Sequence, residues 1–253
     1  MTTYSPLHQA LLDSVPLPED ARIESQRVAY DESGAPMDGH LVWNAALEGP
    51  LPAVLVLHDW TGEQEYTRVR AEMLARLGFV AFAADLYGAG VRPLGDDAPV
   101  EAGKYYGDLA LLRRRVQAAY EVLLADERVD PGRVVVIGYC FGGSAALEFV
   151  RTGAPIAGVV SFHGALIAHE PADVDRIQAP ILVLTGGADP VVPDEAVLAF
   201  ENELRQSPDL DWQVVTYSGA PHAFTLPEIP NYRPVADARS WQALRSFLDE
   251  VLA

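Results

Sequence analysis

The chain has 253 residues, of which 49% are hydrophobic and 21% charged, a length and balance that suit one globular α/β domain. Its formal net charge of −18 argues against binding to nucleic acid or to an anionic membrane, because both attract clustered Lys and Arg. No apolar run approaches the roughly 20 residues of a membrane-spanning helix, and no secretion signal is visible. A single Cys excludes an internal disulfide, so we expect a cytoplasmic protein.

Elements in the first half of the chain are predicted from apolar periodicity and turn residues. Residues 1–20 contain Pro, Ser and Asp, and we expect an extended or loosely packed lead-in. An antiparallel hairpin at a sheet edge is predicted from strands 22–30 and 40–46 around the turn-rich residues 31–39. A strand at 53–57, a helix at 65–77 and a strand at 79–84 follow. The loop 89–100 is rich in Gly, Pro and Asp and is long enough for a lid.

The second half alternates apolar strands with helices, which is the pattern of βαβ units. Strands are predicted at 134–137, 155–162, 181–185 and 212–217, and helices at 109–124, after Gly143, at 194–205 and at 235–252. We therefore expect a single α/β domain over 1–253, with a mainly parallel central sheet, an antiparallel N-terminal edge and helices on both faces. Ligands of such sheets bind beyond the carboxyl ends of the strands.

The most informative motif is Gly138-x-Cys140-x-Gly142, between a β-branched strand and an Ala-rich helix. This is the spacing of a nucleophile elbow, with Cys where Ser is more usual. The sharp turn strains the middle residue, and side chains two positions away would collide, which explains the glycines. Cys140 would stand at a helix N-terminus, where the dipole favours a thiolate. The structural alternative is that a lone Cys is most often a small buried hydrophobe.

A thiol nucleophile needs a base, and the base needs a carboxylate to orient it. Asp189 and His222 follow later strands, so the chain order is nucleophile, acid, histidine, as in an α/β-hydrolase. His222 would accept the thiol proton, while Asp189 would fix the imidazole and stabilise the imidazolium. The N–H groups of Phe141 and Trp60 are predicted to form the oxyanion hole.

Histidines are more often structural than catalytic, and His163 is the strongest rival base among the six. Its strand comes directly after the elbow helix, so the acid would have to follow the histidine; His222 is therefore preferred. No pair of His, Cys and Asp residues has zinc-ligand spacing, and we expect no metal site.

Five motifs occur in order from about residue 25 to the C-terminus: His58-Asp59-Trp60-Thr61-Gly62, Asp85-Leu86-Tyr87-Gly88, Gly138-Tyr139-Cys140-Phe141-Gly142-Gly143, Gly187-Ala188-Asp189 and Pro221-His222-Ala223-Phe224. In this combination the chain resembles the dienelactone hydrolase family of α/β-hydrolases. The resemblance implies the α/β-hydrolase fold, a Cys-His-Asp triad, an acyl-thioester intermediate, no cofactor, and hydrolysis of lactones or other carboxylic esters.

The chain departs from the family pattern at the expected substrate contacts. The family commonly has Glu at the position of Asp59, and the resemblance implies that this carboxylate holds the resting thiol and takes its proton when substrate binds. The best-studied branch of the family has two arginines that bind a substrate carboxylate. Ala89 and Leu226 occupy the matching positions here, and Arg92 is the candidate to take over from the first arginine. Neutral or apolar esters are therefore expected. Aromatic residues that are candidate pocket walls, or equally core packing, are Trp60, Tyr87, Tyr139 and Phe224.

Two other functions stay open. A thiol-dependent acyltransferase would use the same triad but exclude water from the acyl-enzyme. A non-catalytic binding module would retain the fold alone, since fold does not establish function. The expected partner is a small-molecule ester or lactone, without nucleic acid or membrane, and the expected assembly is a monomer or small homo-oligomer.

Overall fold

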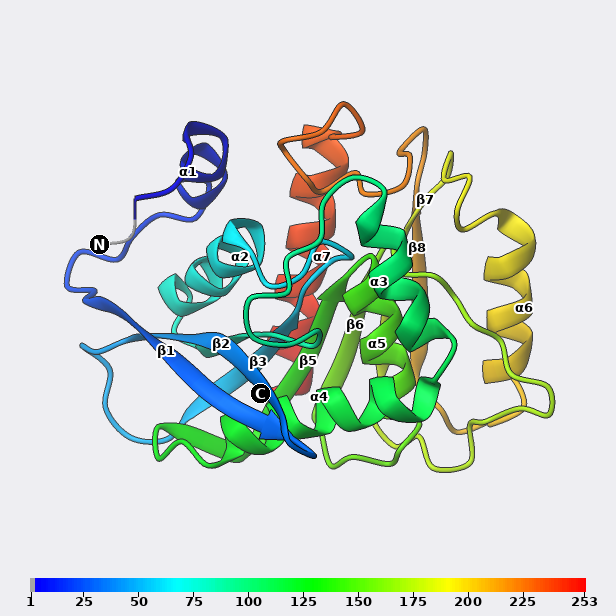
Figure 1. Ribbon diagram of the computed structural model, residues 1–253, viewed down its shortest axis with the longest axis horizontal. Helices are drawn as coiled ribbons and strands as arrows, with labels where there is room; N and C mark the ends of the chain where they lie inside the picture. Colours follow the sequence, from blue (N-terminus) through cyan, green and yellow to red (C-terminus); the bar gives the residue numbers. More distant parts are fainter. Residues whose placement is uncertain (1–2) are drawn as a thin grey trace. The chain divides into compact units, whose positions relative to one another are not determined.

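The computed structural model describes residues 3–253 (Figure 1). Among these residues the chain has an α/β fold with eight strands, mostly in parallel pairs, and seven helices. It divides into two compact units, residues 1–134 and 135–253, and the division falls inside β5 (Val129–Tyr139). The sequence has no linker at this point, and a single domain stays a prediction.

The strands of the first unit carry the antiparallel edge that the sequence predicts. They lie in the order β1 (Ile23–Glu32), β2 (Ala35–Asn44), β4 (Val80–Ala84), β3 (Leu51–Leu57). The pairs β1–β2 and β2–β4 are antiparallel, and β3–β4 is parallel. The apolar side chains of β3 and β4 are almost all buried, as expected for strands covered on both faces.

The hairpin turn is shorter than predicted, because only Ser33 and Gly34 connect the two strands. Both residues have left-handed backbone angles, with φ of 54° and 86°, as a tight two-residue hairpin turn requires. Asp31 Oδ1 accepts a hydrogen bond from Gly34 N–H at 2.8 Å and closes the turn. The remaining turn-type residues of 31–39 lie within the paired strands, so composition alone overestimated the loop.

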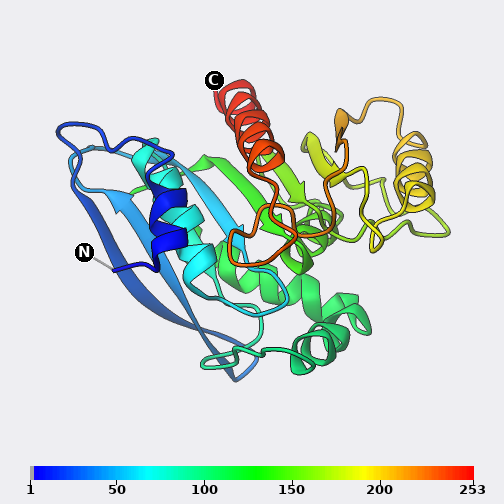
Figure 2. The ribbon, with the colours of Figure 1, turned by 90° about the horizontal axis from the view of Figure 1, so that it is seen from above.

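A short helix within residues 1–20 corrects the expectation of an extended lead-in. Helix α1 (Pro6–Leu12) begins with Ser5, whose hydroxyl accepts from His8 N–H, and with Pro6 at its first position. Leu11 and Leu12 are buried, and α1 lies beside α2 (Glu65–Arg76) in Figures 1 and 2. A capping Ser followed by Pro was the sequence signal for this helix.

A second correction concerns the predicted loop 89–100, whose end belongs to helix α3 (Asp97–Tyr106). Pro99 and Gly103 concealed this helix, but Pro99 lies in the first turn, where a backbone N–H has no partner within the helix. Helix α4 (Leu109–Leu124) follows as predicted, with Asp108 as its N-cap. Figure 2 shows α2 and α4 on opposite sides of the strands of this unit.

The second unit is a parallel sheet in the order β5, β6 (Gly158–Phe162), β7 (Ile181–Gly186), β8 (Trp212–Tyr217). Its helices are α5 (Phe141–Val150), α6 (Asp194–Leu204) and α7 (Pro234–Val251). Helices α5 and α7 both contact β6 and lie on opposite sides of it (Figure 2). Because all four strands run the same way, their carboxyl ends meet at one edge of the sheet.

A buried ion cluster joins α5 to α6. Arg151, at the C-terminal end of α5, is 1% exposed and makes two hydrogen bonds to the Glu203 carboxylate, at 2.6 and 3.0 Å. Its Nε lies 3.5 Å from Glu148 Oε1, and Glu148 in turn lies 2.8 Å from His169 Nε2. These contacts hold the helix that follows Cys140 in one position against its neighbours.

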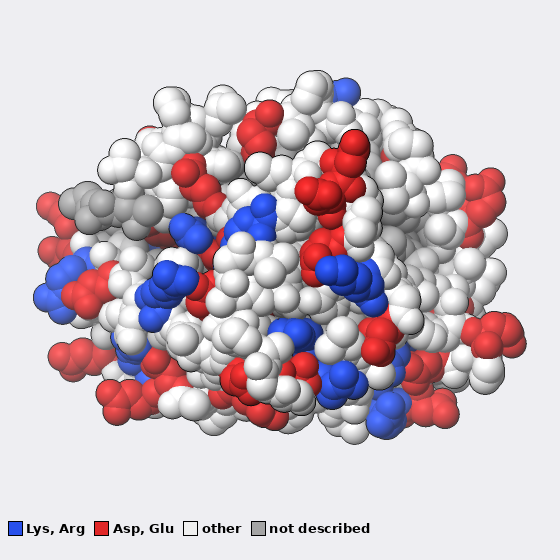
Figure 3. Space-filling view, viewed as in Figure 1, with Lys and Arg blue, Asp and Glu red and all other residues white. Residues whose placement is uncertain are grey.

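Acidic and basic side chains alternate over the surface in view in Figure 3. Within residues 3–253 no helix combines the length and the apolar character needed to cross a membrane.

Candidate active site

Cys140 lies at the turn between β5 and α5 in a strained backbone conformation, with φ of 52° and ψ of −113°. Its N–H donates to Phe162 O at 2.9 Å, so the turn is tied to the neighbouring strand. A Cβ on Gly138 would stand 2.0 Å from Gly142 O, which explains why a glycine is required two residues before the cysteine. This is the geometry of a nucleophile elbow.

Three of the predicted residues form one hydrogen-bonded chain in the second unit. Cys140 Sγ lies 3.1 Å from His222 Nε2, and His222 Nδ1 lies 2.9 Å from Asp189 Oδ2. Asp189 is supplied by the loop after β7 and His222 by the loop after β8. The parallel strands therefore bring together side chains that are 49 and 33 positions apart in the sequence.

The hydrogen bonds of His222 determine its protonation. Burial by itself would lower the pKa of this imidazole, but the hydrogen bonds with Asp189 and Cys140 outweigh it and raise the pKa to about 10. The proton is therefore held on His222 at neutral pH, next to the sulfur. An imidazole in this state is suited to stabilise a thiolate and later to protonate a leaving group.

Hydrogen bonds within the loops hold Asp189 and His222 in place. Asp189 Oδ1 accepts from the N–H groups of Val191 and Val192 at 2.8 and 3.1 Å, which leaves Oδ2 directed at the histidine. Asn231 Nδ2 donates to His222 O at 2.9 Å. Neither these valines nor Asn231 stands in a motif that sequence reasoning could have selected, because their contribution depends on loop conformation.

His163, the rival base, has a different partner. Its Nε2 lies 2.7 Å from Thr225 Oγ1, its side chain is buried, and its ring centroid is 5.5 Å from that of His222. It also packs edge-on against Phe224, at 5.2 Å. His163 therefore forms part of the wall behind His222, and the pairing with Cys140 belongs to His222.

In the first unit, Asp59 and Trp60 lie two and three residues after the end of β3 and form a hydrogen-bonded turn. Asp59 Oδ1 accepts from Thr61 N–H at 2.7 Å and from Thr61 Oγ1 at 2.5 Å. The Asp59 carbonyl accepts from Gly62 N–H at 3.3 Å, and Tyr87 Oη donates to the Trp60 carbonyl at 3.2 Å. The modulating role of Asp59 and the oxyanion role of Trp60 stay predictions.

The model of the dienelactone hydrolase family matches residues 37–252 of this chain. The chain belongs to the dienelactone hydrolase family. A solved dienelactone hydrolase-like promiscuous phosphotriesterase from metagenomic libraries is 38% identical, with a TM-score of 0.88 over 91% of this chain and 99% of the other. A Bradyrhizobium protein described as a "Probable 2-oxo-3-(5-oxofuran-2-ylidene)propanoate lactonase" is 30% identical over 76% of this chain and 81% of its own length.

A more distant solved structure supports the same fold. The dienelactone hydrolase of Anabaena variabilis is 22% identical, with a TM-score of 0.69 over 91% of this chain and 99% of that one. As a member of the dienelactone hydrolase family, the chain is a hydrolase of the lactone or ester type.

No cation lies at the two positions where the resemblance suggested an arginine for a substrate carboxylate. Leu226 is buried and apolar, and Ala89 offers no cation. Arg92 Nη1 donates to the carbonyls of Gly88 and Val91 at 3.2 and 2.8 Å, so its guanidinium stabilises the turn formed by residues 88–92.

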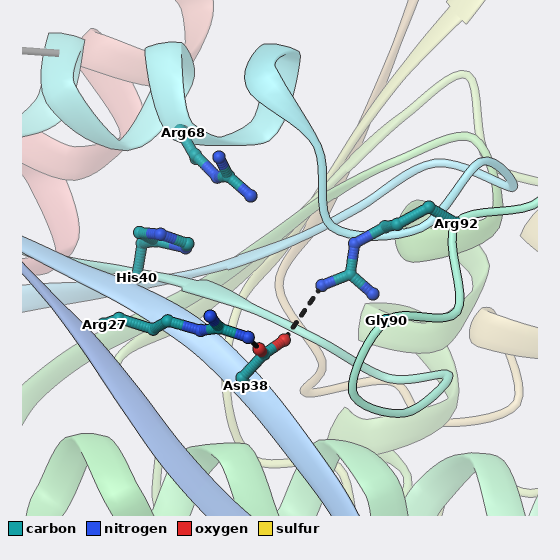
Figure 4. A pocket seen from close by; sticks show the side chains of 6 residues that line it. All are labelled: Arg27, Asp38, His40, Arg68, Gly90 and Arg92. Carbon is teal, nitrogen blue, oxygen red and sulfur yellow. Dashed lines mark hydrogen bonds and ion pairs between the residues drawn. The ribbon is translucent and has the colours of Figure 1, made fainter.

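Arg92 also belongs to a charged cavity of about 280 Å³ in the first unit, lined by Arg27, Asp38, His40, Arg68, Gly90 and Arg92 (Figure 4). Arg92 Nη2 contacts Asp38 and Glu63 at 3.1 and 3.2 Å, and Arg68 makes two hydrogen bonds to Glu63. Burial would raise the pKa of Glu63, but hydrogen bonds from Arg68 and His40 lower it to about 2. These cations are therefore balanced by buried carboxylates.

The remaining predicted wall residues differ in their surroundings. Tyr139 is fully buried and stacks on Phe162 at 4.6 Å, and Phe224 is fully buried beside His163. Tyr87 is 4% exposed and stacks on Tyr105 at 5.2 Å. Their role as pocket walls stays a prediction. Among the side chains of residues 3–253, no group of three His, Cys, Asp or Glu is arranged to hold a metal ion.

Proposed function

We propose that this protein is a cysteine-dependent hydrolase of carboxylic esters or lactones that works through an acyl-thioester. The observation that carries the proposal is the chain of contacts from Cys140 Sγ to His222 Nε2 at 3.1 Å and from His222 Nδ1 to Asp189 Oδ2 at 2.9 Å. Membership of the dienelactone hydrolase family supports the reaction class.

The first half-reaction forms the thioester. Cys140 Sγ attacks the carbonyl carbon while its proton resides on His222, and the carbonyl oxygen becomes an oxyanion for which Phe141 N–H, at the start of α5, is the proposed donor. Collapse of this intermediate breaks the C–O bond, and the leaving alkoxide takes the proton from His222. A lactone opens in the same way, with its alcohol still attached to the acyl group.

The second half-reaction restores the enzyme. His222 takes a proton from water as the water oxygen attacks the thioester carbonyl. The C–S bond breaks, the carboxylic acid is released, and the thiolate regains its partnership with the imidazolium. Asp189 stays ionised and orients His222 throughout.

Neutral acyl groups are the proposed substrates. The net charge of −18 repels anions, Leu226 and Ala89 stand where the family's cations are expected, and Arg92 is paired with Asp38 and Glu63. We expect kcat/KM for a neutral p-nitrophenyl ester to exceed that for a mono-p-nitrophenyl dicarboxylate of equal length by at least tenfold. A preference for the dicarboxylate would overturn this part of the proposal.

Replacement of Cys140 tests the mechanism. Cys140→Ala should abolish hydrolysis of a short-chain p-nitrophenyl ester, and the intact enzyme mixed rapidly with excess ester should gain the mass of one acyl group on Cys140. Retained turnover in Cys140→Ala would refute the assignment. Products formed with and without an added alcohol distinguish the hydrolase from an acyltransferase, because an acyltransferase would form mainly the new ester.

A second activity is supported by one comparison. The solved relative that is 38% identical over 91% of this chain is described as a promiscuous phosphotriesterase. We propose that the same thiol accepts neutral phosphotriesters, because an oxyanion hole also stabilises charge that develops on a phosphoryl oxygen. Release of p-nitrophenol from a diethyl p-nitrophenyl phosphotriester, lost in Cys140→Ala, is the expected result.

A further inference from the structure

Strand β1 lies at the end of the strand order in the first unit (Figures 1 and 2). Among residues 3–253 it pairs with β2 alone, and none of its ten side chains is fully buried. An edge strand of this length presents a row of backbone donors and acceptors, which is a template for pairing with a further strand. Strand β1 is therefore the part of this unit best suited to such pairing.

The hydrogen bonds of the hairpin determine which residues of β1 face the open edge. Opposite residues of an antiparallel pair alternate between hydrogen-bonded and non-hydrogen-bonded pairs. Ala45 N–H donates to Arg22 O at 2.8 Å, just before the first register pair of the two strands. The register then continues in step as far as Glu32 and Ala35, so the even-numbered residues of β1 bond to β2. The open edge therefore presents the backbone groups of the odd-numbered residues, and within residues 3–253 no other group bonds to those of 25, 27, 29 and 31.

The charges of β1 select one register for pairing with a second copy of itself. Strand β1 contains one cation, Arg27, and three acidic residues, Glu24, Asp31 and Glu32. In an antiparallel pair that uses the open edge of both copies, an odd-numbered residue lies opposite an odd-numbered residue. This condition excludes Glu24 and Glu32 as partners of Arg27 and leaves Asp31. A twofold axis through Ala29 places Arg27 of each copy opposite the partner's Asp31.

The same register also matches apolar side chains. It places Val28 opposite the partner's Tyr30 on the other face of the strand, and the twofold axis repeats the contact. Opposite charges and pairs of aromatic with β-branched residues both stabilise facing strands. Moving the axis to Arg27 would place two arginines against each other, and moving it to Val28 would bring Glu24 opposite the partner's Glu32. Charge complementarity therefore favours the axis through Ala29.

Both charged side chains are available for this contact. The Arg27 side chain is 68% exposed, and its Nη2 contacts Asp38, while within residues 3–253 its Nε and Nη1 have no partner. Asp31 Oδ1 accepts from Gly34 N–H at 2.8 Å, and in the same part of the chain Oδ2 has no partner. The pairing therefore needs no existing hydrogen bond to break.

We propose that the protein forms a twofold homodimer through β1, with residues 26–32 of two copies paired antiparallel about Ala29. Three hydrogen-bonded residue pairs would each contribute two main-chain hydrogen bonds. The interface is small, so the expected dissociation constant is on the order of 10 μM. The net charge of −18 on each copy opposes association, and salt of about 0.15 M confines this repulsion to roughly 8 Å.

The oligomeric state of the unmodified protein is the first test. Sedimentation equilibrium from about 1 to 200 μM, at about 0.15 M salt, should show a monomer in equilibrium with a dimer. A monomer over the whole range would leave the edge to a strand of another protein and would overturn the proposal. Species larger than a dimer that grow with concentration would also overturn it, because twofold pairing uses the β1 edge of both copies.

Replacement of Ala29 tests the edge itself. Ala29→Pro removes the N–H at the twofold axis, and this N–H points away from β2, so the hairpin keeps its own hydrogen bonds. The variant should stay monomeric at every concentration while its far-ultraviolet circular dichroism is unchanged. The control Ala29→Thr keeps the N–H and adds a side chain that favours strands, so its dissociation constant should stay within about threefold. A dimer in Ala29→Pro as stable as that of the unmodified protein would refute pairing at this edge.

Exchange of the two charges separates the interface from folding. Asp31→Arg places an arginine opposite Arg27 at two symmetric positions and should raise the dissociation constant by roughly tenfold or more. The double variant Arg27→Asp, Asp31→Arg restores opposite charges across the axis but loses the contacts to Asp38 and Gly34 within each copy. It should therefore dimerise again although its Tm is the lowest. A double variant that dissociates as readily as Asp31→Arg would contradict the register.

Disulfide cross-linking reads the register directly. Ala29→Cys and the control Ser25→Cys are each made together with Cys140→Ala, so that each chain has one thiol. At the axis the two Cα atoms would lie about 5.5 Å apart, within the roughly 4.4–6.8 Å that a disulfide spans. The two copies of position 25 would lie about 27 Å apart, at about 3.4 Å per residue. Oxidised glutathione should convert Ala29→Cys to a covalent dimer and leave Ser25→Cys mainly monomeric, and equal yields would overturn the proposal.

Discussion

The elbow makes Gly138→Ala the most informative single substitution. An added Cβ would stand 2.0 Å from Gly142 O and 2.1 Å from Gly142 C, whereas ordinary contacts begin at 3.4 Å. Both contact atoms are backbone, so the start of α5 has to move by about 1.4 Å, because a packed interior cannot absorb the overlap. A misplacement of about 1 Å at a reacting group costs roughly 100-fold in rate, and overpacking costs about 1–3 kcal/mol in stability.

The assay compares Gly138→Ala with Gly132→Ala, a glycine of the same strand. A Cβ on Gly132 meets only Asp130 Oδ1, at an ordinary 3.5 Å, so this variant should keep the unmodified kcat and Tm. Gly138→Ala should lose about 100-fold in kcat/KM for a short-chain ester and a few degrees in Tm, while its far-ultraviolet circular dichroism stays the same. Equal kcat/KM for the two variants would refute the elbow geometry at Cys140.

Three further predictions concern the triad and the ion cluster of the second unit. Asp189→Asn should lower kcat by roughly 1,000- to 10,000-fold without unfolding the protein, because the amide can favour the wrong tautomer of His222; a loss below tenfold would contradict its role as orienter. Because the hydrogen bonds with Asp189 and Cys140 raise the pKa of His222 to about 10, both ring nitrogens of His222 should be protonated from pH 6 to 9 in an assigned ¹⁵N histidine spectrum, and Asp189→Asn should lower this pKa. A neutral His222 ring at pH 7 in the unmodified protein would contradict the hydrogen-bonded pair. Arg151→Met should lower the free energy of unfolding by about 3–5 kcal/mol, because it leaves buried carboxylates unpaired. The control Arg205→Met removes an exposed ion pair and should change the free energy of unfolding by less than about 1 kcal/mol. Equal urea midpoints for the two variants would show that the buried ion cluster does not stabilise the protein.

The short-range parts of the molecule followed from the sequence. Glycine at position 138 and Cys at 140 define a turn whose local sterics leave few choices, and the β-branched run before it predicts a buried strand. The order Cys140, Asp189, His222 placed each side chain after its own strand, and in a parallel sheet those ends meet at one edge. The helix α2 and the strands β7 and β8 were predicted for the same reason, strong local periodicity.

Elements with weak local signals were missed. Helix α1 depends on Leu11 and Leu12, which become buried in the folded unit, and a helix of this length has little stability by itself. Helix α3 contains Pro99 and Gly103, and composition alone predicts a loop there. In both cases tertiary packing outweighed intrinsic propensity.

The sequence by itself determined the elbow, the order of the triad and the parallel connections, because these depend on residues close together in the chain or on the direction of successive strands. The sequence preferred His222 as the partner of Cys140, and only the tertiary structure puts its Nε2 3.1 Å from the sulfur while His163 contacts Thr225. It also decided that the ring of His58 lies between the Asp59 carbonyl and the Leu86 N–H. The physical reason is that the proton state and direction of a histidine are set by the atoms facing its two nitrogens, and those atoms come from loops that sequence patterns do not position.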